Sequence, residues 1–107
     1  MSRIRDDLDG AILAELKVRL SMLRAKSFEQ LLLLPESGTE EARVLGKRVK
    51  FTVFREHQAD GSLLILVRSD KPIFFGIGSA GTTEGFLAKP DGEKREANGD
   101  EVSEFFA

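Results

Sequence analysis

One short segment has the glycine spacing of a nucleotide-binding loop. Residues 76–81 read Gly-Ile-Gly-Ser-Ala-Gly and follow an apolar stretch. A dinucleotide-binding loop uses this spacing to bring backbone N–H groups and a helix N-terminus up to a pyrophosphate. Residues 82–86 read Thr-Thr-Glu-Gly-Phe, and Pro90 follows closely, so they cannot form the long helix that such a site requires. We therefore interpret 76–81 as a glycine-rich connection between β-strands.

The single histidine is the other candidate for chemistry. An imidazole such as that of His57 can act as a general base near neutral pH. No spacing ties a nucleophile to His57, and the chain has no cysteine to join it in a transition-metal site. The residue approaches the turn signal Asp60-Gly61, so we interpret it as an exposed hairpin histidine. The sequence predicts no catalytic residue, no metal site and no cofactor, and it favours a non-enzymatic protein.

Charged residues gather in three places. Three aspartates within the first ten residues can stabilise the positive end of a helix. Acids outnumber bases from Glu84 onward, but without the spacing of an EF-hand. Bases dominate 43–55, yet the chain lacks the tyrosine and tryptophan on which nucleic-acid bases often stack. Nucleic acid is therefore a disfavoured partner.

The composition is that of an ordinary globular protein. Of the 107 residues, 41% are hydrophobic and 32% are charged, so we expect one domain over 1–107 with one core. No apolar run approaches the ~20 residues of a membrane span. The first residues lack the apolar stretch of a signal peptide, and no disulfide can form. We expect a soluble, cytoplasmic protein with no membrane contact.

The segment 1–34 is predicted to be helical. Apolar residues at helical spacing, with charges between them, predict an amphipathic helix over 4–26; they are Ile4, Leu8, Ile12, Leu16, Leu20 and Leu23. Ser27 and Gln30 match a capping box, which predicts a second helix over 28–33. Because consecutive leucines point all round this second helix, we expect it to be buried on most sides. Whether the two helices are continuous stays open.

From 41 to 97 the pattern changes to period-two alternation punctuated by glycine. This pattern predicts a five- to six-stranded antiparallel β-meander, and hence an α+β fold. The predicted strands are 41–45, 48–56, 62–68, 72–78, 84–89 and 93–97. The predicted turns are Gly46-Lys47, Asp60-Gly61, Asp70-Lys71, the 78–81 region and Pro90-Asp91-Gly92. Asn98 or Asp100 is expected to cap a short C-terminal helix within 99–106.

Two-residue turns at Asp60-Gly61 and Asp70-Lys71 would determine which side chains share a face. One face would then be wholly apolar and form the main core: Val49, Phe51, Val53, Leu64, Leu66, Ile73, Phe75 and Ile77. The second face would be half apolar: Arg48, Lys50, Thr52, Phe54, Leu63, Ile65, Val67, Phe74, Gly76 and Gly78. An antiparallel sheet with one wet face should alternate cleanly. We therefore expect that something covers the second face too.

A shallow trough on this second face is the candidate binding site. In the predicted register Gly76 and Gly78 lie across from Ile65 and Leu63, and a strand glycine often marks where another backbone or a ligand comes close. The candidate binding residues are Phe54, Leu63, Ile65, Val67, Phe74, Gly76 and Gly78, with His57 as a candidate polar group. The alternative is that the chain's own helix fills the trough.

The sequence favours an interaction or accessory module that binds a second copy of itself or another protein through this face. One alternative is a small-molecule-binding domain or minor enzyme that uses the trough, with His57, Arg55 or Arg68 as polar groups. The predicted register argues against their convergence, since it places Arg55 and Arg68 at opposite ends of the sheet. Another alternative is an acidic, inhibitor-type binder of a basic partner, using the acidic C-terminal segment.

Overall fold

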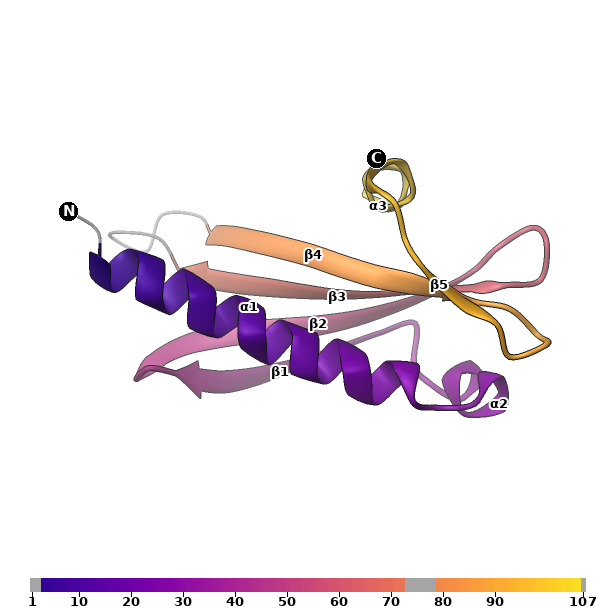
Figure 1. The fold of residues 1–107 in the computed structure, drawn as a ribbon, viewed down its shortest axis with the longest axis horizontal. Helices are drawn as coiled ribbons and strands as arrows, with labels where there is room; N and C mark the ends of the chain where they lie inside the picture. Colours follow the sequence, from indigo (N-terminus) through magenta and orange to yellow (C-terminus); the bar gives the residue numbers. More distant parts are fainter. Residues whose placement is uncertain (1–2, 73–78, 107) are drawn as a thin grey trace.

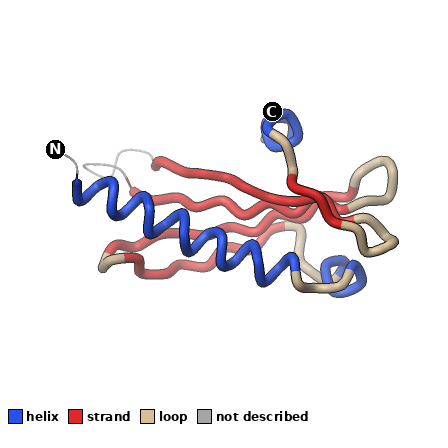
Figure 2. The backbone as a smooth tube through the Cα atoms, viewed as in Figure 1, coloured by secondary structure: helices blue, strands red, loops and turns tan. Residues whose placement is uncertain are grey.

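A helix, an antiparallel meander and a short helix follow one another along the chain (Figures 1 and 2). The computed structural model describes residues 3–72 and 79–106, and the side chains of 7–71 and 81–106. The elements are α1 (Arg3–Arg24), α2 (Phe28–Leu32), β1 (Ser37–Val44), β2 (Lys47–His57), β3 (Leu63–Pro72), β4 (Ser79–Ala88), β5 (Lys94–Glu96) and α3 (Gly99–Phe105). The strands form one antiparallel sheet in the order β1-β2-β3-β4-β5. The predicted α+β fold is confirmed.

Helix α1 lies across one face of the sheet (Figure 1). Its apolar positions predicted from helical spacing include Ile12, Leu16 and Leu23, which are all buried. The capping box predicted for α2 is present: the Gln30 N–H donates to the Ser27 hydroxyl, and the Ser27 N–H donates to the Gln30 side chain. The cap makes α1 and α2 separate helices. None of the described helices is both long and apolar enough to cross a membrane.

Helix α2 is less buried than predicted. Leu31 is fully buried, but Leu32 is 37% exposed and Leu33 is 85% exposed. A helix of five residues contacts the core along one line only, so the expectation of burial on most sides is wrong. Arg55 of β2 ties this helix to the sheet, because its Nη1 donates to the Leu32 carbonyl at 2.6 Å.

The β1–β2 turn lies one residue earlier than predicted. Val44 pairs with Lys47, so the turn residues are Leu45 and Gly46, with φ of 50° and 80°. Positive φ at both central residues is the geometry of a type I′ turn, which matches the twist of the flanking strands. A leucine in this conformation costs about 1–2 kcal/mol.

The β2–β3 loop is one residue longer than predicted. The Gln58 N–H donates to the Ser62 carbonyl at 2.9 Å, the Gly61 N–H donates to the Gln58 carbonyl at 3.0 Å, and Gly61 has a φ of 88°. This is a three-residue loop closed by a glycine rather than a two-residue turn. Hydrogen bonds from the Ser62 hydroxyl and N–H hold the pKa of the Asp60 carboxyl below its ordinary value.

The extra residue in the β2–β3 loop shifts the register by one, so each side chain of β3 lies on the face opposite to the predicted one. The register pairs Val53 with Val67 and Phe54 with Leu66. The face beneath α1 therefore carries Val49, Phe51, Val53, Leu63, Ile65, Val67, Phe86 and Ala88. Our prediction that Leu64 and Leu66 belong to this main core is wrong.

The opposite face has a smaller apolar cluster at the α3 end. Its members are Leu64, Leu66 and Leu87, with Phe54, Ala97, Val102 and Phe105 packed against them. The ring of Phe54 lies 5.1 Å from that of Phe105 and 5.5 Å from that of Phe106, measured between centroids. Asn98 caps α3 as predicted. The short final helix thus covers the apolar half of this face.

The predicted turn at Asp70-Lys71 is wrong. Strand β3 continues to Pro72 and pairs Asp70 with Gly81. The pairing β3–β4 therefore replaces the tight hairpin that we predicted, and the region from Ser79 to Gly81 belongs to a strand rather than to a turn. Apart from Pro72, the predicted strand 72–78 lies outside the described residues.

The predicted trough depends on that hairpin. In the structure Leu63 lies opposite Ala88 and Ile65 lies opposite Phe86, while Gly76 and Gly78 lie outside the described residues. The β4–β5 turn, in contrast, is confirmed at Pro90-Asp91-Gly92. Gly92 has a φ of 96° there, and its N–H donates to the Lys89 carbonyl.

Candidate functional site

The outer side of β4 is only partly covered by β5. Strand β5 pairs with Phe86–Ala88 alone. The Ala97 N–H then donates to the Gly85 carbonyl at 2.9 Å, and the chain leaves the sheet to form α3. From Gly81 to Glu84 no described strand pairs with this outer side (Figure 1). We call the outer side of residues 81–84 the β4 edge.

Two residues of the β4 edge direct their backbone groups outward. In an antiparallel ladder, alternate residues direct both their N–H and their C=O to the same side. Because the Gly85 carbonyl is bound by Ala97 on the outer side, Thr83 and Gly81 also direct their N–H and C=O away from β3. A free row of such groups is a template for another strand.

Glycines keep β4 close to β3 along this stretch. A Cβ added at Gly85 would overlap with the Ile65 carbonyl oxygen and with the Leu66 side chain. One added at Gly81 would overlap with the Ser69 carbonyl oxygen. Because neither overlap can be relieved without moving backbone, both positions require glycine. Their lack of side chains also leaves the β4 edge accessible from the α3 side.

A pocket of about 480 Å³ continues the line of β5 along the β4 edge; we call it the β5-end pocket. It is lined by Leu20, Thr83, Glu84, Gly85, Glu96, Ala97, Asn98, Gly99, Val102 and Ser103. Its two charged residues are both acids. Glu84 is 3.7 Å from Lys17 and Glu96 is 3.9 Å from Arg24, so both carboxylates have only long, exposed ion pairs to α1.

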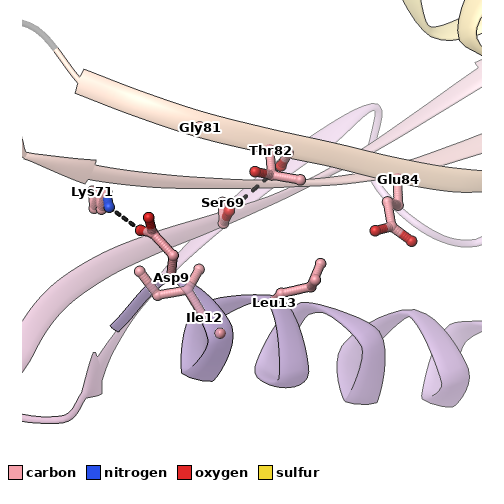
Figure 3. A pocket seen from close by; sticks show the side chains of 9 residues that line it. Asp9, Ile12, Leu13, Ser69, Lys71, Gly81, Thr82 and Glu84 are labelled. Carbon is pink, nitrogen blue, oxygen red and sulfur yellow. Dashed lines mark hydrogen bonds and ion pairs between the residues drawn. The ribbon is translucent and has the colours of Figure 1, made fainter. Parts of the chain in front are cut away.

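A second pocket, of about 460 Å³, lies between α1 and the strand pair β3–β4 (Figure 3); we call it the α1-side pocket. Its lining is Asp9, Gly10, Ile12, Leu13, Ser69, Lys71, Gly81, Thr82 and Glu84. Asp9 and Lys71 form an ion pair across its mouth, and the Ser69 hydroxyl donates to the Thr82 carbonyl at 3.4 Å. Glu84 and Gly81 belong to this pocket and to the β4 edge, so the edge runs between the two pockets.

Several polar side chains of the α1-side pocket are engaged within the chain. The hydroxyl of Ser69 is occupied by the Thr82 carbonyl, and the single histidine, His57, stands at the far end of β2 from this pocket. In the described part of the chain, no group of three or more histidines or acids is placed to hold a metal ion. Within the described residues, the site offers the backbone groups of Gly81 and Thr83, with which no strand pairs, and two pockets beside them.

The opposite edge of the sheet has a different character. Strand β1 carries Glu40, Glu41 and Arg43, and most of its residues are exposed. Charged residues on an edge strand discourage pairing with another chain. The β4 edge has only Glu84 at one end and is uncharged over 81–83. The two edges are therefore not equivalent as docking positions.

The structure does not bring the predicted binding residues together. Leu63, Ile65 and Val67 have no exposed surface and lie beneath α1. Phe54 lies on the opposite face beside α3. The remaining three, Phe74, Gly76 and Gly78, lie outside the described residues.

The candidate polar groups do not converge either. His57 is exposed and pairs with Leu63 at the end of β2. Arg55 points to the α1 face, where its Nη1 binds the Leu32 carbonyl and its buried Nε has no partner among the described residues. Arg68 lies on the other face, with its Nε 3.0 Å from the Asp70 carboxylate and its guanidinium 5.4 Å from the Phe106 ring.

Sequence reasoning missed the β4 edge because it depends on how far β5 extends. The sequence did carry one signal: the run Gly81-Thr82-Thr83 has no charge and no proline to guard an edge. The residues after Gly81 form a strand, where a dinucleotide loop would need a helix.

Comparisons of the chain with protein-family models, with curated proteins and with solved structures found no match.

Proposed function

We propose that this protein is a non-enzymatic interaction module that accepts an extended strand of a partner protein at the β4 edge. The observation that carries the proposal is the row of outward backbone groups at Gly81 and Thr83 beyond the end of β5. Strand addition obtains affinity from main-chain hydrogen bonds and specificity from pockets that receive alternate side chains. The β5-end pocket and the α1-side pocket lie beside the β4 edge, where they would receive side chains of an added strand.

The proposal keeps the interaction function that the sequence favours, but it moves the contact. The apolar residues that we expected to meet a partner are divided between the core beneath α1 and the cluster beneath α3. An edge needs no exposed apolar face, since its backbone groups supply the contact. A second copy of the chain is a competing occupant of the same edge.

A proline in the edge tests the proposal. Because the Thr83 N–H points away from β3, Thr83→Pro removes a donor from the β4 edge without removing a hydrogen bond to β3; prolines are tolerated at such positions. Thr39→Pro is the matched control, since Thr39 is also an edge threonine. Three residues before it, the Glu36 carbonyl accepts a hydrogen bond from the Arg55 N–H on β2. Because alternate residues face the same side, the Thr39 N–H points outward.

We expect tagged chain to retain its partner from an extract of its source cells, to lose it with Thr83→Pro, and to keep it with Thr39→Pro. In the complex, the amide hydrogens of Gly81 and Thr83 should exchange more slowly than in the free chain. Equal retention by Thr83→Pro, or unchanged exchange at both amides, would contradict the proposal. Light scattering of the pure chain identifies a second copy as the occupant if it shows a dimer that Thr83→Pro dissociates.

A further inference from the structure

We infer that the partner strand runs antiparallel to β4 and is basic, with a lysine or arginine opposite Glu84. This inference rests on the proposed strand addition and adds the direction and the chemistry of the partner. It follows from the position of the two pockets relative to β5 and from the charges that line them.

The direction follows from β5. This strand runs antiparallel to β4 and ends at Glu96. Ala97 already fills the position opposite Gly85. The β5-end pocket lies beyond it, where further residues of β5 would stand opposite Glu84 and Thr83. A partner strand in that place continues the sheet in line with β5. It exchanges hydrogen bonds with the outward groups of Thr83 and then of Gly81.

The alternation of a strand then assigns its side chains. Partner residues opposite Glu84 and Thr82 point to the α1 side, and the residue opposite Thr83 points to the α3 side. Glu96 is paired with Phe86, which is two residues beyond Glu84 on β4. The partner side chain opposite Glu84 therefore lies on the same face as Glu96 and next to it along the line of β5. A side chain at that position is therefore placed between two carboxylates.

The charges of the lining match a cation there. Together the two pockets are lined by the carboxylates of Asp9, Glu84 and Glu96 and by one ammonium, Lys71, which is already paired with Asp9. The ion pairs of Glu84 and Glu96 to α1 are long and exposed, so replacing them costs little. Leu20 provides an apolar wall for the stem of a lysine or arginine.

The position opposite Thr82 calls for a different side chain. It lies beside the α1-side pocket, where Ile12 and Leu13 provide apolar surface (Figure 3). Read from its N-terminus, the partner segment is therefore basic, then small, then apolar. A second copy of this chain fits less well, because a symmetric pair of edges brings the same acidic lining against itself.

Blocked synthetic peptides test the charge and the edge separately. The probe is Lys-Thr-Val-Thr-Thr, which begins at the lysine because Ala97 and Glu96 occupy the positions opposite Gly85 and Phe86. Two matched peptides replace its lysine by glutamine or by glutamate. Binding to the full chain is followed by NMR amide shifts, which also locate each peptide. We expect shifts at Gly81 and Thr83, with the lysine peptide binding about fivefold tighter than the glutamine peptide, as for a favourable cross-strand pair, and the glutamate peptide weakest.

Two variants complete the test. Glu84→Gln should remove the preference for lysine, while Glu41→Gln, an exposed acid on the β1 edge, should keep it. If all three peptides shift Gly81 and Thr83 with equal affinity, strand addition stands and the basic partner is refuted. A lysine preference that survives Glu84→Gln refutes it as well. If no peptide shifts these amides, the proposed function and this inference both fail.

Discussion

At the scale of single residues, the two strand glycines of β4 allow close packing against β3 and also leave the β4 edge open. A Cβ added at Gly81 or at Gly85 would overlap with the backbone of β3. The same absence of side chains leaves the β4 edge open. Gly10 is different, because it lies within α1 and a Cβ there would meet no atom within 4 Å.

Gly85→Ala should lower the free energy of unfolding by about 3 kcal/mol, the upper part of the range for overpacked interiors. The Ile65 carbonyl that a Cβ would overlap cannot move without distorting β3. Gly10→Ala is the control with the opposite sign and should raise the same quantity by about 0.5–1 kcal/mol, because alanine favours helix. Urea denaturation measures both. An unchanged urea midpoint for Gly85→Ala would contradict the close packing of β4 against β3 at this position.

At the scale of elements, α3 is held in place by a network at its first turn. The Glu101 carboxylate accepts hydrogen bonds from both Nη atoms of Arg95 on β5, at 3.1 and 2.7 Å, and from the Asn98 N–H. Together these donors hold the pKa of the Glu101 carboxyl below its ordinary value. The contact fixes α3 over the apolar cluster, and it fixes the point at which the chain leaves β5.

The lowered pKa predicts a pH dependence. Because the pKa of Glu101 is lower in the folded chain than in the unfolded one, its contribution to stability is present above the ordinary glutamate value. It is lost as the pH falls through the lowered folded-state value. Glu101→Gln should therefore flatten the loss of stability in that acidic window, measured by urea denaturation at stepped pH. Glu104→Gln, on the same helix, should follow the wild-type curve; an equally steep curve for Glu101→Gln would refute the assignment.

At the scale of the whole molecule, packing of α1 on the sheet supplies the main core. Leu16 of α1 is fully buried there, in one cluster with Phe51, Ile65 and Phe86 of three strands. On the other side of the helix, Val18 is 54% exposed. The helix thus covers one face of the sheet, and among the described strands none pairs with the β4 edge.

Leu16→Ala should lower the free energy of unfolding by about 3 kcal/mol, since it removes buried methyl groups and leaves a cavity. Val18→Ala, on the exposed side of the same helix, should change it by less than about 0.5 kcal/mol. Chemical denaturation followed by circular dichroism measures both variants. Similar effects from the two substitutions would contradict the packing of α1 described above.

The sequence by itself determined the helices and the α+β class, although not the bounds of every strand. The apolar spacing of α1, the capping box at Ser27 and the cap residue Asn98 are local signals, and the helices begin close to where these signals predict. The α+β class and the antiparallel meander were predicted for the same reason, because alternation and turn residues act over a few positions.

Only the tertiary structure decided the faces and the site. One extra residue in the loop closed by Gly61 exchanges the two faces of β3, so Leu63, Ile65 and Val67 became core rather than surface. Likewise, β3 continues past Asp70, where the turn residues had suggested a hairpin. Strand register depends on loop length and on pairing between distant segments. For the same reason the β4 edge, which exists because β5 stops short, could not be read from local pattern.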